Sequence, residues 1–155
     1  MAGRIESRLQ ELGIELPRAP VPAAAYVPYV LVGNTLYIAG QIPVWHGELR
    51  YVGKLGVEYS IEEGQAAARQ CGVNIIAQVA DALDGDLDRV KRCVKLGGFV
   101  NATPDFREHP KVINGASELM IQVFGDAGRH ARFAVGAYSL PFNVAVEIDA
   151  IFQVA

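Results

Sequence analysis

Residues 131–154, ARFAVGAYSLPFNVAVEIDAIFQV, carry the pattern that decides the fold. Between 144 and 154 every second residue is apolar, and Glu147 and Asp149 stand among the residues that separate them. Successive side chains of a strand point to opposite faces of a sheet, so one face of this strand should pack on a core while the other carries carboxylates. Residues 131–140 alternate in the same way. The stretch therefore predicts two neighbouring strands joined by a short turn, a hairpin.

Upstream of this pair, two helices flank a further strand. The Ser60–Glu63 capping box opens a helix whose apolar residues recur at helical spacing over 61–83. Residues 90–101 alternate well enough for a strand. Residues 111–124 predict a second amphipathic helix, which ends at Gly125 because glycine favours the backbone conformation of a helix stop.

The N-terminal third predicts a short helix, a proline-rich arm and a hairpin. Residues 5–12 have helical spacing, and the three prolines within 17–22 force the next segment into an extended arm. Strands over 26–32 and 35–43 flank a Gly-Asn turn, which favours a hairpin. The glycine-rich residues 44–58 then indicate a loop with one short strand.

The order of elements is helix, hairpin, helix, strand, helix, hairpin. This order is typical of an α+β fold with one sheet and two helices on one face. A chain of 155 residues is enough for one ordinary domain. We therefore expect an N-terminal helix and extended arm over residues 1–22 and a single α+β domain over residues 23–155.

Composition excludes several classes of protein. Hydrophobic residues make up 51% of the chain and charged residues 20%, which rules out a disordered chain. No apolar window reaches the length of a membrane span, and residues 1–12 lack the apolar stretch of a secretory signal, so we expect a cytoplasmic protein. The net charge of −3 provides no general attraction to nucleic acid. Cys71 and Cys93 lack metal-ligand spacing, so we expect buried free thiols and no metal site.

Arg132 and Glu147 are the candidate chemical pair of the last two strands. An even number of residues in the connecting turn would direct both side chains to one side of the sheet. They would then form either a cross-strand ion pair on a solvated face or part of a site. Ala134 and Gly136 favour a site, because small residues leave space beside the guanidinium for a substrate carboxylate. Spacing alone leaves both alternatives open.

Three segments together resemble the RidA (YjgF) family, whose older labels include endoribonuclease L-PSP and translation inhibitor. They are GNTLYIAGQIP over 33–43, Val112-Ile113-Asn114, and the series ARFAV, LP and VEIDAI between 131 and 151. The resemblance extends over residues 24–154. It implies a chorismate-mutase-like α+β fold with a mixed sheet, and a homotrimer with ligand clefts between subunits.

The resemblance also implies an activity and a set of site residues. The family hydrolyses reactive enamines and imines, such as 2-iminopropanoate and 2-iminobutanoate, to 2-keto acids and ammonia, and it needs no cofactor. Arg132 matches the arginine that holds the substrate carboxylate, and Glu147 matches the acid that helps to hold the attacking water. The positions that match the substrate-binding wall are Tyr26, Gly40, Gln41, Asn114 and Ala134.

Departures from the family pattern indicate a distinct subgroup. Ala39 stands where many members have Ser, Ala134 stands where some have Cys, and residues 1–22 extend beyond the common chain. One alternative function is therefore non-catalytic binding of small carboxylates. Another is RNA binding or cleavage, which we do not expect because no stacking aromatic residues alternate with the basic residues. Those residues are Arg89, Lys91, Arg92 and Lys95.

The chain has many apolar and few charged residues, which agrees with the homotrimer that the resemblance implies. Apolar surface that neither the core nor a membrane covers is covered by a partner. We expect the sheet face away from the helices to be covered by two further copies of the chain in a homotrimer. We place Ala134 and Gly136 on that face.

Overall fold

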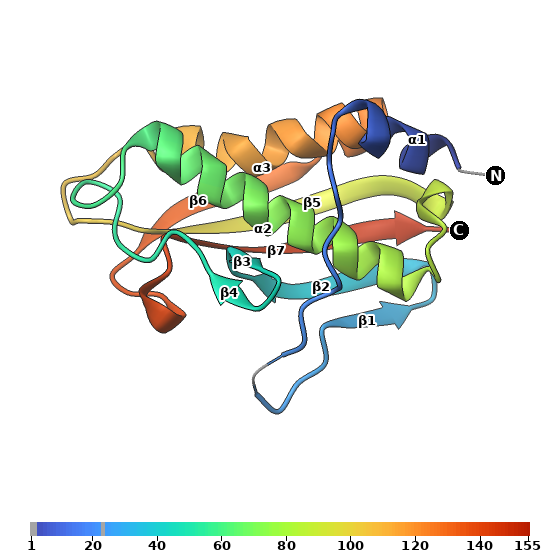
Figure 1. Ribbon diagram of the computed structural model, residues 1–155, viewed down its shortest axis with the longest axis horizontal. Helices are drawn as coiled ribbons and strands as arrows, with labels where there is room; N and C mark the ends of the chain where they lie inside the picture. Colours follow the sequence, from blue (N-terminus) through green and yellow to red (C-terminus); the bar gives the residue numbers. More distant parts are fainter. Residues whose placement is uncertain (1–2, 23) are drawn as a thin grey trace.

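A five-stranded mixed sheet covered on one face by two long helices forms the body of the protein (Figure 1). The computed structural model describes residues 3–22 and 24–155, so Met1 and Ala2 of the expected N-terminal segment and Ala23 of the expected domain lie outside the described residues. The strand order is β1-β2-β7-β5-β6. The strands are β1 (Tyr29–Val32), β2 (Thr35–Gln41), β5 (Val90–Asn101), β6 (Ala131–Ala137) and β7 (Val146–Val154).

The two long helices pack side by side on the sheet. Helix α2 (Ile61–Ala82) lies over β2 and β7, and helix α3 (His109–Phe124) lies over β5 and β6. Both capping-box hydrogen bonds between Ser60 and Glu63 are present at the start of α2, as predicted. Helix α3 begins two residues before the predicted residue 111, because Pro110 fits the first turn of a helix. These elements confirm the α+β fold and the position of both helices on one face.

The alternation of β7 holds as predicted. Its even-numbered residues are buried under the helices, and Glu147, Asp149, Ile151 and Gln153 on the other face are partly or fully exposed. Cys71 of α2 and Cys93 of β5 are both buried and free. Burial raises the pKa of both thiols, that of Cys93 to about 12. The core therefore lies mainly between the sheet and the helices, and within residues 3–22 and 24–155 no further layer covers the second face of the sheet.

The predicted hairpin between the last two strands is wrong. β6 pairs in parallel with β5, while β7 inserts between β5 and β2 and runs antiparallel to both. Asn101, the buried last residue of β5, donates from Nδ2 to the Val144 carbonyl oxygen and to Asn143 Oδ1, both at 3.0 Å. The connection between β6 and β7 thus crosses over the end of β5, which separates the two strands.

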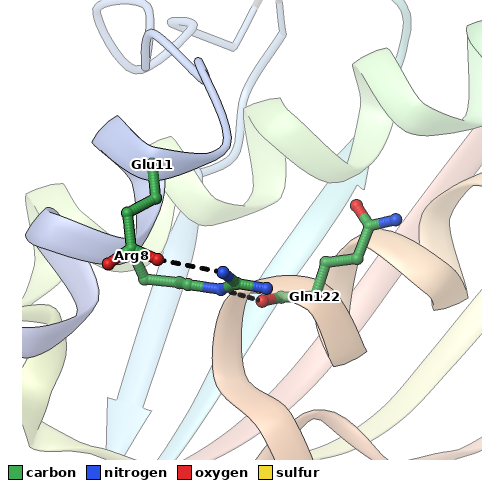
Figure 2. A network of polar contacts seen from close by, with 3 residues as sticks. All are labelled: Arg8, Glu11 and Gln122. Atoms are coloured by element: carbon green, nitrogen blue, oxygen red, sulfur yellow. Dashed lines mark hydrogen bonds and ion pairs between the residues drawn. The ribbon is translucent and has the colours of Figure 1, made fainter.

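The N-terminal helix α1 (Arg4–Glu11) docks on α3. Ile5 and Leu9 are buried, and the Asp88 carboxylate accepts from the backbone N–H groups of Arg4 and Ile5. Figure 2 shows Arg8 donating from Nε to the Gln122 carbonyl oxygen at 2.8 Å, while its Nη1 contacts Glu11 at 3.0 Å. The following arm runs across α2 to β1 (Figure 1). A helix and an extended segment thus occupy the N-terminal residues that the structure describes.

The segment 44–58 contains two short strands where the sequence predicts one. β3 (Val44–Trp45) and β4 (Glu48–Leu49) form a small antiparallel pair outside the main sheet. His46 and Gly47 turn the chain with φ angles of 50° and 82°. Within residues 3–22 and 24–155, none of the helices combines the length and apolar character that a membrane crossing requires.

The crossing of α2 and α3 generates a test of the packing. A Cβ atom added at Gly115 would collide with the backbone carbonyl of Gln65 on α2, whereas one at Gly72 would meet only the end of the Leu119 side chain, at 2.8 Å. Intrinsic helix propensity favours alanine over glycine by about 1 kcal/mol at both sites. We expect Gly115→Ala to lower the free energy of unfolding by about 1–3 kcal/mol, because a backbone contact cannot relax. Urea denaturation measures this loss, and Gly72→Ala, the matched control, should lose less. Equal stability of Gly115→Ala and wild type would contradict the close crossing.

Candidate active site

One cavity of about 730 Å³ opens where the arm, β2 and β7 meet. Four of the residues predicted from the sequence line it: Tyr26, Gly40, Gln41 and Glu147. The rest of the wall is largely apolar and comes from residues 17–22 of the arm, from the β3–β4 segment and from Pro141 and Phe142. A cavity of this size suits a small-molecule ligand.

A row of polar side chains on α2 holds these walls in place. Asn74 donates to the carbonyl oxygens of Ile42 and Val44, at 3.0 and 2.8 Å, and Gln70 donates to Val44 as well. One turn further along, Gln78 donates to the Pro20 carbonyl oxygen at 2.6 Å. Buried amides need such partners, since an unpaired polar group costs about 1–3 kcal/mol. The arm and the β3–β4 segment are therefore fixed to the helix by side chains from its buried face.

Glu147 faces the cavity with its carboxylate against Gly40. A Cβ atom at position 40 would collide with Glu147 Oε2, so a larger residue there would require the Glu147 carboxylate to move. Burial raises the pKa of Glu147, and the neighbouring carboxylate of Asp149 raises it further. Within the described residues the Glu147 carboxylate takes part in no hydrogen bond or ion pair, so it is available to a ligand or a water molecule.

Arg132 lies in a different place, between β6 and α3. Its Nη1 donates to Ser117 Oγ and its Nη2 donates to the Pro110 carbonyl oxygen, both at 3.0 Å. Asn114 stands on the same face of α3, four residues after Pro110 and three before Ser117. Partial burial lowers the pKa of the Arg132 guanidinium. Arg132 and Ser117 thus form a second polar group that is separate from the cavity, and Asn114 lies on the same face of α3.

The prediction that Arg132 and Glu147 point to one side of the sheet is wrong. Arg132 is level with Leu96 of β5, whose side chain is buried under the helices, whereas Glu147 is level with the exposed Phe99. The two Cα atoms are two strands and three residues apart, about 14 Å at standard strand spacings. The two strands are not joined as a hairpin, so no turn aligns these residues, and β5 lies between the two strands. One chain does not bring the two side chains to the same small substrate.

Ala134 and Gly136 are also on the helix face, which corrects their predicted place on the outer face. Ala134 is level with Gly98, where a Cβ atom would meet Ile113 of α3, and a Cβ atom at Gly136 would meet His109. Both small residues therefore allow α3 to approach β6. Ala134 lies two residues after Arg132 and faces the same side of the sheet.

Comparison with known proteins agrees with this fold. A family model described as "YjgF/chorismate mutase-like, putative endoribonuclease" matches residues 6–152. The chain belongs to this family. It is 50% identical over 153 residues to Protein TCP17 of Trypanosoma cruzi, which covers 98% of this chain and 95% of that one.

Two solved structures show where the chain stands within the YjgF family. A protein of unknown function from Agrobacterium tumefaciens is 50% identical, with a TM-score of 0.92 over 97% of this chain and 92% of that chain. RidA from an Antarctic Psychrobacter bacterium is 29% identical, with a TM-score of 0.61 over 88% of this chain and 94% of that chain. The chain is therefore much more similar in structure to the Agrobacterium protein than to this RidA.

Ser117 and His130, two polar residues beside Arg132, are not among the site residues predicted from the sequence. Ser117 Oγ lies 2.8 Å from His130 Nε2, and both contact the group that contains Arg132. Period-2 spacing places His130 on the same side as Arg132, and helical spacing places Ser117 beside Asn114. Both spacings can be read from the sequence, but the contact between Ser117 and His130 depends on how α3 docks on β6.

The raised pKa of Glu147 predicts a pH-dependent stability. At pH 7 the ionised carboxylate is less favourable in the folded chain than in the unfolded chain, and this cost disappears below the unfolded pKa of about 4.5. We expect Glu147→Gln to unfold at a higher temperature than wild type at pH 7, with a gain that shrinks as the pH falls towards 4.5. Thermal unfolding followed by circular dichroism measures both effects. Glu118→Gln, on the exposed face of α3, controls for the loss of one negative charge, and a gain that does not vary with pH would contradict the raised pKa.

Proposed function

We propose that the protein hydrolyses small carboxylate-bearing imines and enamines, of the 2-iminopropanoate or 2-iminobutanoate type, to 2-keto acids and ammonia. We further propose that it works as a cytoplasmic homotrimer in which each site combines Glu147 of one copy with Arg132 of the next. The observation that carries this proposal is the separation of the two side chains on opposite faces of one sheet, about 14 Å apart. Each chain carries one half of the site at Glu147 and the other half at Arg132. In a symmetric assembly, the Glu147 half of one copy meets the Arg132 half of the next.

The uncovered sheet face supports self-association. Large apolar side chains on this face are between 39% and 61% exposed, and they extend across the whole sheet from β1 to β6. An apolar surface of this extent favours a partner of the same kind, because water contact with each side chain is unfavourable. The residues are Val30, Val32, Tyr37, Phe99 and Val135.

The side chains supply what imine hydrolysis requires. The carbon of a protonated imine is already electrophilic, so the protein has only to orient the substrate, place a water molecule and accept a proton. Arg132 offers a planar guanidinium for the substrate carboxylate. Glu147, with its raised pKa, takes a proton of the attacking water as the new C–O bond forms, and returns it to the nitrogen. The C–N bond then breaks and ammonia leaves, while the new hydroxyl loses its proton to Glu147 and becomes the keto oxygen.

The basic residues near β5 do not favour the alternative of RNA binding. Arg89 donates to the Ala155 carbonyl oxygen and Arg92 to the Arg129 carbonyl oxygen, at 2.9 and 2.8 Å. The Lys95 ammonium lies 5.5 Å from the centre of the Phe133 ring. Three of the four cations thus have partners within the chain, and binding to phosphate would compete with those contacts.

Mixing two inactive variants tests the proposal directly. We expect Arg132→Ala and Glu147→Gln each to lower the rate of imine hydrolysis by about 10- to 100-fold, as for the loss of a hydrogen bond to a charged group. Unfolded together and refolded at equal amounts, they should recover about a quarter of the wild-type rate, because a quarter of the inter-subunit sites receive both native residues. The imine is generated by a serine dehydratase, and semicarbazide traps what remains.

Matched controls separate the possible outcomes. Arg129→Ala and Glu118→Gln remove the same charges from exposed positions and should keep the wild-type rate. No recovery in the mixture, with an active wild type, would show that the site lies within one copy. An inactive wild type that still binds a small carboxylate, with binding lost in Arg132→Ala, would favour the non-catalytic alternative. A monomer in light scattering would overturn the trimer.

A further inference from the structure

Ser117, His130 and Arg132 form a chain of hydrogen bonds at the edge of the sheet. His130 stands between the short helical turn η2 (Gly125–Gly128) and β6, and Ser117 projects from α3. His130 Nε2 lies 2.8 Å from Ser117 Oγ, and His130 Nδ1 lies 2.6 Å from the Gly128 carbonyl oxygen. Arg132 Nη1 lies 3.0 Å from Ser117 Oγ.

The partners determine the direction of each bond. A carbonyl oxygen only accepts, so His130 Nδ1 must carry the proton that faces Gly128. In the neutral ring Nε2 then has a lone pair, and Ser117 donates its hydroxyl proton to it. Burial lowers the pKa of His130, the hydrogen bond to the Gly128 carbonyl oxygen partly opposes this, and the charge of Arg132 lowers the pKa further. The net pKa is below the ordinary value for histidine, so the ring is neutral at pH 7. Ser117 therefore faces a base that is held in the required tautomer.

Arg132 acts on the same hydroxyl from the other side. Its guanidinium donates to a lone pair of Ser117 Oγ, so a negative charge developing on this oxygen, or on an acyl oxygen beside it, would be stabilised. A nucleophile, a base and a group that orients the base are the three parts of an activated hydroxyl. In this chain they are Ser117, His130 and the Gly128 carbonyl.

The environment of Ser117 differs from that of an ordinary helix serine. A serine within a helix usually bonds to the carbonyl four residues earlier, yet Ser117 makes no such bond within the described residues and turns to His130 instead. All three residues are partly exposed, beside the edge strand β6 of the sheet. If the Ser117–His130 hydrogen bond served only to attach η2 to α3, the additional hydrogen bond from the Arg132 guanidinium to the Ser117 hydroxyl would not be needed.

We propose that Ser117 is an activated nucleophile that takes the acyl group of small carboxylic esters, with His130 as its base and Arg132 as the partner of the oxyanion. The Ser117 oxygen attacks the acyl carbon while its proton passes to His130 Nε2. The ester C–O bond then breaks, and the leaving alkoxide takes that proton. Water hydrolyses the acyl-serine by the same route, which releases the acid and restores the hydroxyl, so that one ester and one water give one acid and one alcohol.

Covalent labelling tests the proposal without any imine substrate. The full-length protein is incubated with diisopropyl fluorophosphate, and the adduct formed with loss of fluoride is followed by intact mass and located by peptide sequencing in the mass spectrometer. We expect a single adduct on Ser117, and an acyl-enzyme burst with 4-nitrophenyl acetate. Ser117→Ala should abolish both signals, and His130→Gln should slow both by about 100-fold or more.

Controls distinguish reactivity from folding and from the proposed imine hydrolysis. Ser139→Ala removes an exposed hydroxyl and should label like wild type. In His130→Ala, added imidazole should restore part of the labelling rate, which a purely structural histidine would not allow. An unlabelled wild type, or labelling that persists in Ser117→Ala, overturns the proposal. Labelling in a protein that leaves imines untouched would reject only the proposed deaminase function, although both activities share Arg132.

Discussion

The two faces of β7 are the constraint on which the rest of the structure depends. β7 is the central strand, hydrogen-bonded to β2 on one side and β5 on the other, so its alternation extends across the sheet. Its apolar face can be buried only under α2 and α3, which leaves Glu147 and Asp149 on the uncovered face. A shift of one residue in the pairing would exchange the core with the carboxylates. The position of Glu147 and the exposed apolar face are thus two results of the same register.

Strand order then decides which polar groups can act together. Arg132 is on β6 and Glu147 is on β7. β5 lies between these strands, and the two side chains point to opposite faces of the sheet. The guanidinium joins Ser117 and His130 under α3, while the carboxylate joins the cavity beside the arm. This separation connects the two proposals made for the chain. Imine hydrolysis needs a second copy of the chain to bring Arg132 and Glu147 together, whereas ester hydrolysis uses only Arg132 with Ser117 and His130.

The polar row on α2 connects the core with the cavity wall. Asn74 and Gln78 are buried among apolar neighbours, and their amides hold the β3–β4 segment and the arm. The arm supplies residues 17–22 of the cavity wall. Residues that stabilise the fold therefore also shape the space in front of Glu147.

Local features could be read from the sequence because they depend on near neighbours. The capping box at Ser60, the Gly33-Asn34 turn and the alternation of β7 each involve residues a few positions apart. The pairing of β6 with β5 could not be read, because adjacency in sequence favoured a hairpin and the bonds of Asn101 that route the chain over β5 come from residues about 40 positions away. The Ser117–His130 contact likewise required α3 to dock on β6. Short-range geometry follows from residue type and spacing, whereas strand order and helix docking depend on which surfaces bury the most apolar area together, and that is decided only when the whole chain folds.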